Sequence, residues 1–210
     1  KDGFGDSADW SFWSPQMQEY CEQDTAVTLA LYRHILKQGL SRDAEALEHS
    51  VVRVCSKMED RGWKFDSNAA DALASKLMVK KHELREQLVS VFPPKVTKLK
   101  TKTKTEPFNP GSRQEIARVL KEMYQWAPTE LTATGQPKID DAILSELQYP
   151  EARLLCDYLL VVKRLGQIAD GDEAWLKLVK RGRIHGRINT NGAVTGRATH
   201  SKPNLAQVPA

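Results

Sequence analysis

The sequence predicts an α+β protein that is mostly helical and ends in a β-hairpin. Apolar residues recur at three- and four-residue steps through most of the chain before residue 180, which is the period of a helix with one buried face. From Arg183 the period changes to two, and Ile184 and Ile188 alternate with polar residues, as in a half-buried strand. Asn191-Gly192 then stands where a tight hairpin turn is expected.

Two helices are predicted in the first 62 residues. The first begins at Pro15 and ends at Gly39, and the second is capped by residues 41–43 (Ser-Arg-Asp) and ends at Gly62. A serine before the first turn can accept a backbone N–H, and glycine tolerates the left-handed conformation that ends many helices.

A long helix follows a short extended piece at residues 63–65. Either Asp66 or Ser67 can cap this helix, and the sequence leaves that choice open. The helix is expected to run to about Val91, because the two prolines at 93–94 cannot continue it.

The tract after these prolines, KVTKLKTKTKTE, alternates lysine and threonine. This is the period of a strand, but no apolar face accompanies it, so a mobile loop or a ribbon is expected. Residues 108–112 (Phe-Asn-Pro-Gly-Ser) are typical of a turn, and Ser112 is expected to cap a helix that runs to about Tyr124.

The remaining elements are short, apart from one helix. A connector rich in Thr, Gly and Pro covers residues 128–138, and Asp140 is expected to cap a short helix. A longer helix is predicted at 150–169, and helical periodicity continues over 175–179. Residues 193–195 are expected to return from the hairpin turn as its second strand.

Composition excludes several classes of protein. The chain is 40% hydrophobic and 28% charged, which is ordinary for a globular protein and too apolar for a wholly disordered one. No apolar run approaches the ~20 residues that a membrane helix needs, so no membrane partner is expected. The three cysteines are far apart and form no Cys-x-x-Cys pair, so neither a zinc site nor a disulfide framework is expected. Both ends of the chain are expected to be cuts within a longer protein.

The net charge of +4 is unevenly distributed. Residues 1–94 hold 12 Lys and Arg against 15 Asp and Glu, whereas residues 95–210 hold 19 against 12. Two stretches, 95–104 and 177–202, are basic and contain no acid. Such runs suit a polyphosphate partner, because each neutralised phosphate releases a counterion. A solvated surface explains the charge equally well, so charge alone leaves both interpretations open.

The C-terminal segment carries the most specific motif. Residues 192–209, GAVTGRATHSKPNLAQVP, resemble the TGR…PNLQ segment that opens the palm of family A DNA polymerases, the bacterial polymerase I class. The form found here is most similar to the replicative polymerases of short-tailed lytic phages.

Four further stretches resemble the same family in the same order. Residues 47–66 include MEDRGWKFD and are similar to the segment that begins the polymerase domain, and residues 108–112 are similar to the FN-x-x-S turn of the thumb. Residues 163–164 (Lys-Arg) fall where the family places thumb cations. Residues 19–24 (EYCEQD) match the third motif, Tyr-x-x-x-Asp, of the proofreading 3′→5′ exonuclease.

The resemblance implies a domain organisation and a function. Residues 1–40 would be the C-terminal end of an RNase H-like exonuclease domain, 41–66 a connector and the start of the polymerase domain, 67–180 a helical thumb with a basic tip loop at 93–107, and 181–210 the first β-hairpin of the palm. The implied protein is a template-directed DNA polymerase that extends a primer 3′ end during phage DNA replication, in the cytoplasm of the infected bacterial host.

Partners and cofactors follow from the same resemblance. Primer–template DNA is the expected partner of this segment, and dNTPs are expected to bind the full-length parent. Mg²⁺ is the expected cofactor, in two-metal sites that lie mostly outside the segment, so the segment alone is expected to be inactive. A non-catalytic DNA-binding subunit of a split polymerase remains the alternative.

The palm segment is expected to contact the minor groove. Minor-groove N3 and O2 acceptors occur at similar positions in every correct base pair, so donors placed there test shape without reading sequence. Arg197 and Gln207 are long donors suited to that role, and Gly196 allows close backbone approach. The resemblance implies DNA contacts in this segment from Thr195, Gly196, Arg197, His200, Asn204 and Gln207.

Tyr20 and Asp24 are four residues apart, so the phenol and the carboxylate share one face of a helix. Two-metal hydrolysis of a phosphodiester needs carboxylates that hold the metals and a group that orients the attacking water. The resemblance implies that Asp24 is an exonuclease Mg²⁺ ligand and that Tyr20 positions the water. The family's other exonuclease motifs would precede residue 1, so exonuclease activity is not expected from this segment alone.

The other implied DNA contacts lie in the thumb. Asn109 and Ser112 are expected to donate to the DNA backbone near their turn, and Lys163 and Arg164 from the later helix. The tip lysines expected to contact duplex phosphates are Lys95, Lys98, Lys100, Lys102 and Lys104. A solvated flexible loop remains the alternative for these five lysines.

The length of the tip bears on a processivity factor. In the best-known phage relative, a much larger insertion at this place binds host thioredoxin. Only about 17 residues join Val91 to Phe108 here, the length of an ordinary connection. The short tip makes a thioredoxin-type factor doubtful.

Overall fold

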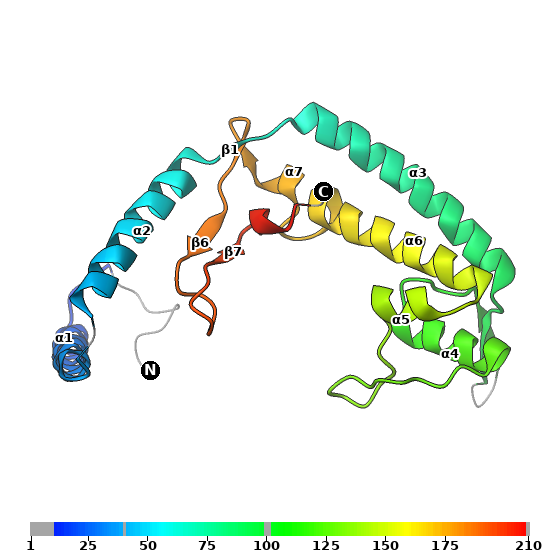
Figure 1. Cartoon of the computed structure of the whole chain (residues 1–210), viewed down its shortest axis with the longest axis horizontal. Helices are drawn as coiled ribbons and strands as arrows, with labels where there is room; N and C mark the ends of the chain where they lie inside the picture. The colour runs from blue at the N-terminus through cyan, green and yellow to red at the C-terminus, as the bar shows by residue number, and fades with distance from the viewer. Residues whose placement is uncertain (1–10, 40, 99–101, 209–210) are drawn as a thin grey trace. The chain divides into compact units, whose positions relative to one another are not determined.

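The structure is a computed structural model that describes residues 11–39, 41–98 and 102–208. Its backbone separates into two compact units, one up to Lys57 and one from Met58 onward. The described chain is mostly helical and contains small antiparallel sheets, which confirms the predicted α+β class. Figure 1 shows the order of the elements along the chain.

The first unit consists of helix α1 (Pro15–Lys37) and the larger part of helix α2 (Arg42–Arg61). Both helices occur where the periodicity predicts them. Ser14 caps α1, because its Oγ accepts the Met17 N–H at 3.1 Å. Neither helix buries any described side chain, so neither contributes to a core within this unit.

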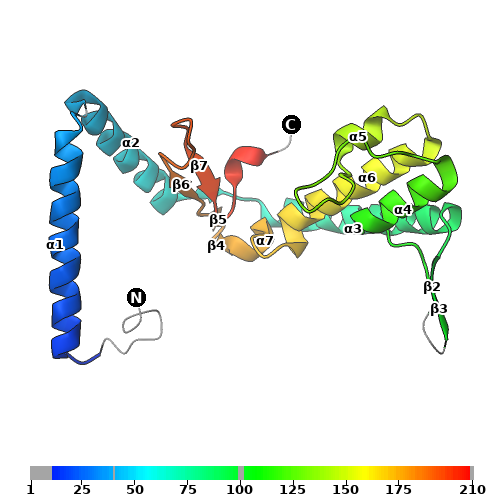
Figure 2. The same cartoon turned by 90° about the horizontal axis from the view of Figure 1, so that it is seen from below.

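The core of the second unit lies between two long helices. Helices α3 (Ser67–Val91) and α6 (Pro150–Leu165) run side by side (Figures 1 and 2). Leu88 on α3 and Leu155 and Leu165 on α6 are completely buried. This pair is the support on which the shorter elements are arranged.

Three polar side chains cap three helices of this unit at predicted positions. Each accepts the backbone N–H three residues later, which satisfies one of the orphan donors of the first turn. The pairs are Asp66 with Ala69 at 3.0 Å before α3, Ser112 with Glu115 at 3.3 Å before α4 (Arg113–Tyr124), and Asp140 with Ile143 at 3.0 Å before α5 (Asp141–Glu146). The structure therefore assigns the cap of α3 to Asp66 and not to Ser67.

Helix α6 passes into one π-helical turn, η1 (Gly166–Asp170), where the periodicity predicts that an α-helix continues. The Gly171 N–H donates to the Gly166 carbonyl oxygen at 3.0 Å, which spans five residues and widens the turn. A Cβ on Gly171 would lie 2.5 Å from that oxygen, so the closure requires glycine. A short helix, α7 (Trp175–Leu178), follows.

A three-stranded antiparallel sheet joins the start of the second unit to its last third. Its strands are β1 (Trp63–Lys64), β5 (Arg183–Ile184) and β4 (Val179–Lys180), in that spatial order. Trp63 lies opposite Ile184, and Ile184 also lies opposite Val179. Val179, which periodicity places in a helix, therefore begins a strand.

The terminal hairpin forms with a different return strand from the predicted one. Strand β6 (Arg187–Asn189) pairs with β7 (Thr199–Ser201), so the prediction for residues 193–195 is wrong. The Gly196 N–H donates to the Ala193 carbonyl oxygen at 2.9 Å, and Gly196 has φ +73°. Residues 193–197 thus make a second turn, which delays the return strand.

The end of helix α2 is bonded to the strands from β5 to β6. The His185 imidazole donates from Nδ1 to the Glu59 carbonyl oxygen at 2.8 Å, and the Ile188 N–H donates to the Glu59 carboxylate. Gly62 ends α2 with φ +64°, and a Cβ there would lie 2.8 Å from the His185 ring and from the Ile184 carbonyl oxygen. We call this set of contacts the Glu59–Gly62 joint.

The lysine-threonine tract forms an antiparallel ribbon of β2 (Lys95–Lys98) and β3 (Thr103–Glu106). Of the two predicted alternatives, a ribbon and a mobile loop, the ribbon is therefore confirmed. Figure 2 shows the ribbon projecting from the helices. Lys95 lies opposite Glu106 at its base, and Lys98 opposite Thr103 at its far end. Lys100 lies outside the described residues.

Within the ranges that the structure describes, no helix is both long enough and apolar enough to span a lipid bilayer.

Tyr124 supports a prediction about stability. Its hydroxyl donates to Glu151 Oε2 at 2.5 Å, and its ring stacks on Tyr149 with a centroid distance of 4.1 Å. Burial first, and then the Glu151 hydrogen bond, raise the pKa of Tyr124 to about 12. Tyr124→Phe is expected to lower the free energy of unfolding by about 1 kcal/mol at neutral pH, measured by urea denaturation.

The pH dependence of that difference follows from the sign of the shift. Since the folded pKa of Tyr124 is raised above the ordinary value of 10.0, the neutral phenol stabilises the fold fully below pH 10.0. The difference between wild type and Tyr124→Phe should shrink as the pH rises through about 12. Tyr149→Phe, which keeps the stacked rings, is the control; an equal loss in that variant would contradict the role of the Glu151 bond.

The Glu59–Gly62 joint gives a second prediction. Gly62→Ala is expected to cost about 3 kcal/mol or more, because a left-handed backbone and a steric overlap both oppose its Cβ. Gly182→Ala is the matched control, since Gly182 has φ +73° in the same sheet region but no atom within 4 Å of a Cβ. That variant should cost only about 1 kcal/mol. Equal losses in chemical denaturation would show that the close approach is unimportant.

Candidate nucleic-acid interface

A polar recess brings together residues from α6 and from the end of the chain. It has a volume of about 320 Å³ and contains Lys163, Asn204 and Gln207, three of the residues predicted to contact DNA. The other lining residues are Gly166, Gln167, Gly171, Glu173, Trp175 and Pro203. The C-terminal segment reaches this recess through a 3₁₀ turn, η2 (Leu205–Gln207), and Asn204 Oδ1 caps that turn by accepting the Ala206 N–H at 3.1 Å.

The position of the C-terminal segment depends on two backbone contacts. The Lys202 N–H donates to Glu173 Oε2 at 3.2 Å, so one acidic group of the recess already has a partner. A Cβ on Gly186 would lie 2.9 Å from the Pro203 carbonyl oxygen, so Gly186 lets this segment approach the strands closely. Gln207 is exposed, and its amide is accessible at the rim of the recess.

Lys163 also lines a second recess, on the side of α6 that faces α4 and α5. This recess has a volume of about 390 Å³ and includes Gly111 and Arg113 beside Asp140 and Asp141. Asp140 is engaged in capping α5, and its pKa is lowered first by the Ile143 N–H and then by Lys138. Lys163 therefore connects the turn before α4 with the polar recess at the end of the chain.

The predicted contacts Asn109 and Ser112 build the start of helix α4. Asn109 Oδ1 accepts the Gly111 N–H at 3.0 Å, and the Asn109 N–H donates to Glu115 Oε2 at 3.0 Å. Ser112 Oγ accepts the Glu115 N–H, as described for the cap. The acceptor oxygens of both side chains are thus engaged, whereas the Asn109 Nδ2 amide and the Ser112 hydroxyl hydrogen are donors that these bonds do not use.

Arg164 points elsewhere than Lys163. Consecutive residues on a helix project about 100° apart, so the two cations cannot share a face. Arg164 Nη1 donates to Gln167 Oε1 at 3.1 Å, and its side chain lines a separate apolar recess with Leu73 and Leu77. Arg164 therefore contributes to the polar recess through Gln167 and not by lining it.

The turn between β6 and β7 carries the predicted residues Thr195, Gly196 and Arg197. All three are exposed, and none of them lines either recess on α6. No atom lies within 4 Å of a Cβ at Gly196, so its glycine is required by the positive φ alone. The prediction that these residues approach the minor groove stays a prediction.

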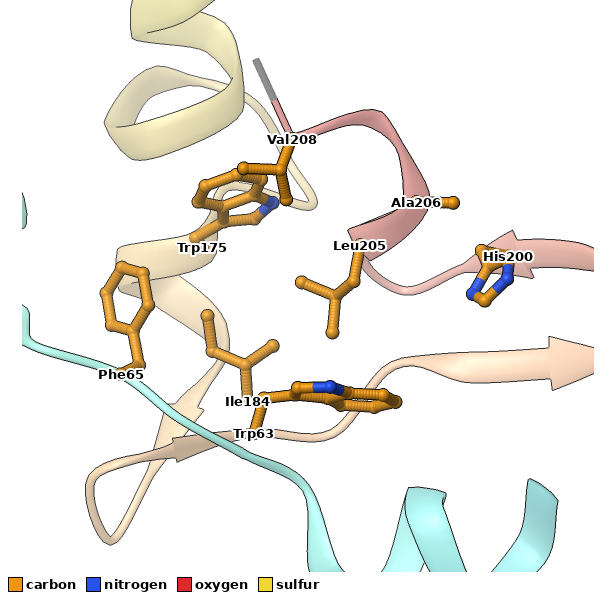
Figure 3. A pocket seen from close by; sticks show the side chains of 8 residues that line it. All are labelled: Trp63, Phe65, Trp175, Ile184, His200, Leu205, Ala206 and Val208. Atoms are coloured by element: carbon orange, nitrogen blue, oxygen red, sulfur yellow. The ribbon is translucent and has the colours of Figure 1, made fainter. Parts of the chain in front are cut away.

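His200 lies at the edge of an apolar recess of about 320 Å³ (Figure 3). Trp63, Trp175 and Leu205 line it from β1, α7 and η2. His200 is half-buried and does not line the recess that contains Lys163 and Gln207. Of the residues predicted in this segment, only Asn204 and Gln207 line that recess.

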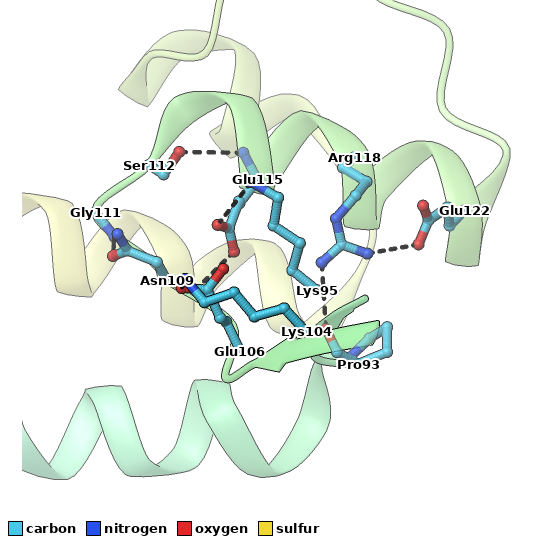
Figure 4. A network of polar contacts seen from close by, with 10 residues as sticks. All are labelled: Pro93, Lys95, Lys104, Glu106, Asn109, Gly111, Ser112, Glu115, Arg118 and Glu122. Carbon is cyan, nitrogen blue, oxygen red and sulfur yellow. Dashed lines mark hydrogen bonds and ion pairs between the residues drawn. The ribbon is translucent and has the colours of Figure 1, made fainter. Parts of the chain in front are cut away.

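Two of the ribbon lysines, Lys95 and Lys104, have carboxylate partners (Figure 4). Lys104 Nζ lies 2.8 Å from Glu106 Oε1, and Lys95 Nζ lies 3.9 Å from Glu115 Oε1. The Lys104 hydrogen bond and charge lower the pKa of Glu106, and the Lys95 charge lowers it further. Lys98 and Lys102 are exposed, and neither pairs with a carboxylate of the described residues.

Tyr20 and Asp24 interact on α1, as their spacing predicts. The Asp24 charge, and then a hydrogen bond with its carboxylate, raise the pKa of the Tyr20 phenol. In the part of the chain that the structure describes, no three His, Cys, Asp or Glu side chains gather as metal ligands would. Asp24 alone does not fit a two-metal site, which needs several carboxylates.

Two residues of these recesses do not stand out in the sequence. Gln167 follows Lys163 by one helical turn, so helical spacing could have placed it beside that lysine. Arg113 follows the cap Ser112 directly, and the cap could have drawn attention to it. The π turn that presents Gln167 has no comparable signal in the sequence.

Similarity to known proteins extends over most of the chain. The model of DNA polymerase family A matches residues 76–210. The DNA-directed DNA polymerase of Escherichia phage T7 is 31% identical over 287 aligned positions, which cover 97% of this chain and 41% of that protein. The enzyme of Enterobacteria phage T3 has the same identity and coverage.

Bacterial proteins are similar at lower identity. DNA polymerase I of Pseudomonas aeruginosa is 26% identical over 202 residues, covering 92% of this chain and 21% of that protein. The POL domain of Pol1 from M. smegmatis, solved in complex with DNA primer-template and dNTP, is similar in fold, with a TM-score of 0.58 and 24% identity. That likeness covers 75% of this chain and 26% of the other.

The chain spans about two fifths of the length of its phage relatives and a smaller share of the bacterial ones. The family match begins within α3 and includes the ribbon, both recesses on α6 and the terminal hairpin. Because this match covers well over half of the residues, the chain belongs to DNA polymerase family A.

Proposed function

We propose that this chain is a segment of a DNA-directed DNA polymerase that extends a primer 3′ end on a template, and that the segment holds the primer–template duplex. Membership of family A supports the activity of the parent. The convergence of Lys163, Asn204 and Gln207 on one recess supports the role of the segment, because it joins helix α6 to the C-terminal turn, two parts that are distant in the sequence.

The chemistry of the polar recess suits a duplex. Lys163 offers a cation for a backbone phosphate, and the Gln207 amide is a donor for the N3 or O2 acceptors of the minor groove. Since those acceptors are common to all correct base pairs, the grip would depend on the shape of the duplex and not on its sequence. The Asn109 Nδ2 amide and the Ser112 hydroxyl, whose donors the cap contacts do not use, would extend the duplex contacts from α6 toward the start of α4.

The four-part organisation belongs to the same proposal. Residues 1–40 would end a proofreading exonuclease domain, 41–66 would connect it to the polymerase domain, 67–180 would be the thumb, and 181–210 would begin the palm. Tyr20 and Asp24, which interact on one face of α1, would serve the exonuclease. No catalytic step is assigned to this segment, because its described carboxylates do not assemble a metal site.

We also propose that no thioredoxin-type factor binds the tip of the thumb. The phage alignments extend over 287 positions although this chain has 210 residues, so those relatives contain additional residues within the matched span. Here the tip is a ribbon of two four-residue strands. Direct contact between this ribbon and the duplex would take the place of a bound factor.

The duplex grip is tested by measuring binding of the full chain to a fluorescent primer–template at several salt concentrations. Lys163→Ala is expected to weaken binding equally for all sequences and to reduce the slope of log K against log salt by about 0.9. Lys121→Ala, at the far end of α4, is the matched control and should leave the slope unchanged. A wild-type chain that binds with no salt dependence would contradict the proposal.

Gln207 is tested with altered duplexes. Gln207→Ala should weaken binding of a natural duplex by about 1 kcal/mol, the usual worth of one net hydrogen bond. A second duplex carries purines without the N3 acceptor near the primer end. The wild type should bind this duplex about 1 kcal/mol more weakly than the natural one, whereas Gln207→Ala should bind both duplexes equally. Additive losses would show that Gln207 does not donate to the minor groove.

A further inference from the structure

We propose that the lysines of the β2–β3 ribbon have two different roles. The paired lysines, Lys95 and Lys104, bind carboxylates of the protein, on α4 and within the ribbon respectively, and the distal lysines, Lys98 and Lys102, bind phosphates of the duplex. This inference rests on the proposed duplex-binding function and adds to it an assignment of individual residues. It is carried by the strand register and by the ion pairs of Lys95 and Lys104.

The register places the two groups differently. Residues directly opposite in an antiparallel pair project to the same face, and the face alternates along each strand. Lys104 lies opposite Thr97 and Lys95 opposite Glu106, so Lys95, Lys104 and Glu106 share one face. Lys98 projects to the other face at the far end, and Lys102 precedes β3 beyond the last described pair.

The shared face is tied to the body of the unit. Glu115, which holds Lys95 at 3.9 Å, also accepts the Asn109 N–H and lies in the first turn of α4. Arg118, one turn further along α4, donates from Nη2 to the Pro93 carbonyl oxygen at 3.3 Å, immediately before β2. Figure 4 shows these groups converging on the base of the ribbon. The base is therefore fixed by contacts that do not involve the distal end.

The charge that remains available to a duplex differs between the groups. A lysine that binds a phosphate releases a condensed counterion, and that release drives much of the affinity. Lys104 and Lys95 already neutralise Glu106 and Glu115, so a phosphate would have to displace those carboxylates. Lys98 and Lys102 have no such carboxylate among the described residues, and both are exposed. The ribbon thus presents its uncompensated charge at the end away from the helices.

The test measures the salt dependence of duplex binding by the full chain. The double variant Lys98→Gln/Lys102→Gln should reduce the slope of log K against log salt by about 1.8, or about 0.9 for each phosphate that is no longer neutralised. The matched variant Lys95→Gln/Lys104→Gln removes the same charge from the same ribbon and should reduce the slope by less than about a third as much. Equal reductions, or a larger one in the second variant, would overturn the division between paired and distal lysines.

A third variant tests the same idea in the opposite direction. Glu106→Gln releases Lys104 from its carboxylate, so the slope should become steeper than in the wild type. Amine-reactive labelling adds a readout for each residue: bound duplex should protect Lys98 and Lys102 more than Lys95 and Lys104. Equal protection of all four lysines would overturn the proposal.

The two proposals fail in distinguishable ways. If the wild-type chain binds duplex with a steep slope and Lys163→Ala weakens it, but the distal variant has no effect, only the assignment within the ribbon fails. If the wild type shows no salt-dependent binding, the proposed function fails before the ribbon is considered. Circular dichroism of each variant checks that the fold is retained.

Discussion

The contact between the end of α2 and the strands near His185 determines where the last third of the second unit lies. Glu59 contributes both its carbonyl oxygen and its carboxylate, and Arg183 donates to the Gly62 carbonyl oxygen across 121 positions of sequence. Asp66, four residues after Gly62, begins α3, so the same short segment fixes the long helix and the terminal strands. Helix α6 packs on α3, and the C-terminal turn follows the strands. Because the segment from Glu59 to Asp66 holds α3 and the strands together, α6 and the C-terminal turn come together to form the polar recess.

Local signals in the sequence were sufficient for the starts of helices α3, α4 and α5. The caps Ser112 and Asp140 act on N–H groups only three residues away, and the ends at Gly39 and Gly62 depend on the left-handed conformation of single residues. Such features are predictable because their causes lie within one helical turn. The same holds for the pairing of Tyr20 with Asp24, which needs only the geometry of α1.

Features that depend on distant residues were predicted less well. Asn191-Gly192 indicated a tight turn, but the second turn at Gly196 moved the return strand to Thr199–Ser201, where it pairs with β6. The π turn after Leu165 closes on Gly171 through a backbone contact that no periodicity reveals. For the same reason, the sequence named Lys163, Asn204 and Gln207 separately, and only the packing of α6 against the C-terminal segment shows that they share a recess.

Charge composition identified the ribbon as basic but overestimated the number of its lysines that are available to bind phosphates. Its lysines are equivalent in the sequence, yet Glu106 pairs with Lys104 on the same strand and Glu115 of α4 pairs with Lys95. A lysine with a carboxylate within 4 Å is already paired and is less available to a phosphate. The strength of the interface therefore depends on the number of cations without a carboxylate partner and not on the total number of cations. The same reasoning applies to α6, where Arg164 is engaged with Gln167 while the neighbouring Lys163 lines both recesses. An excess of positive charge thus locates an interface, and the arrangement of the acids decides which cations act in it.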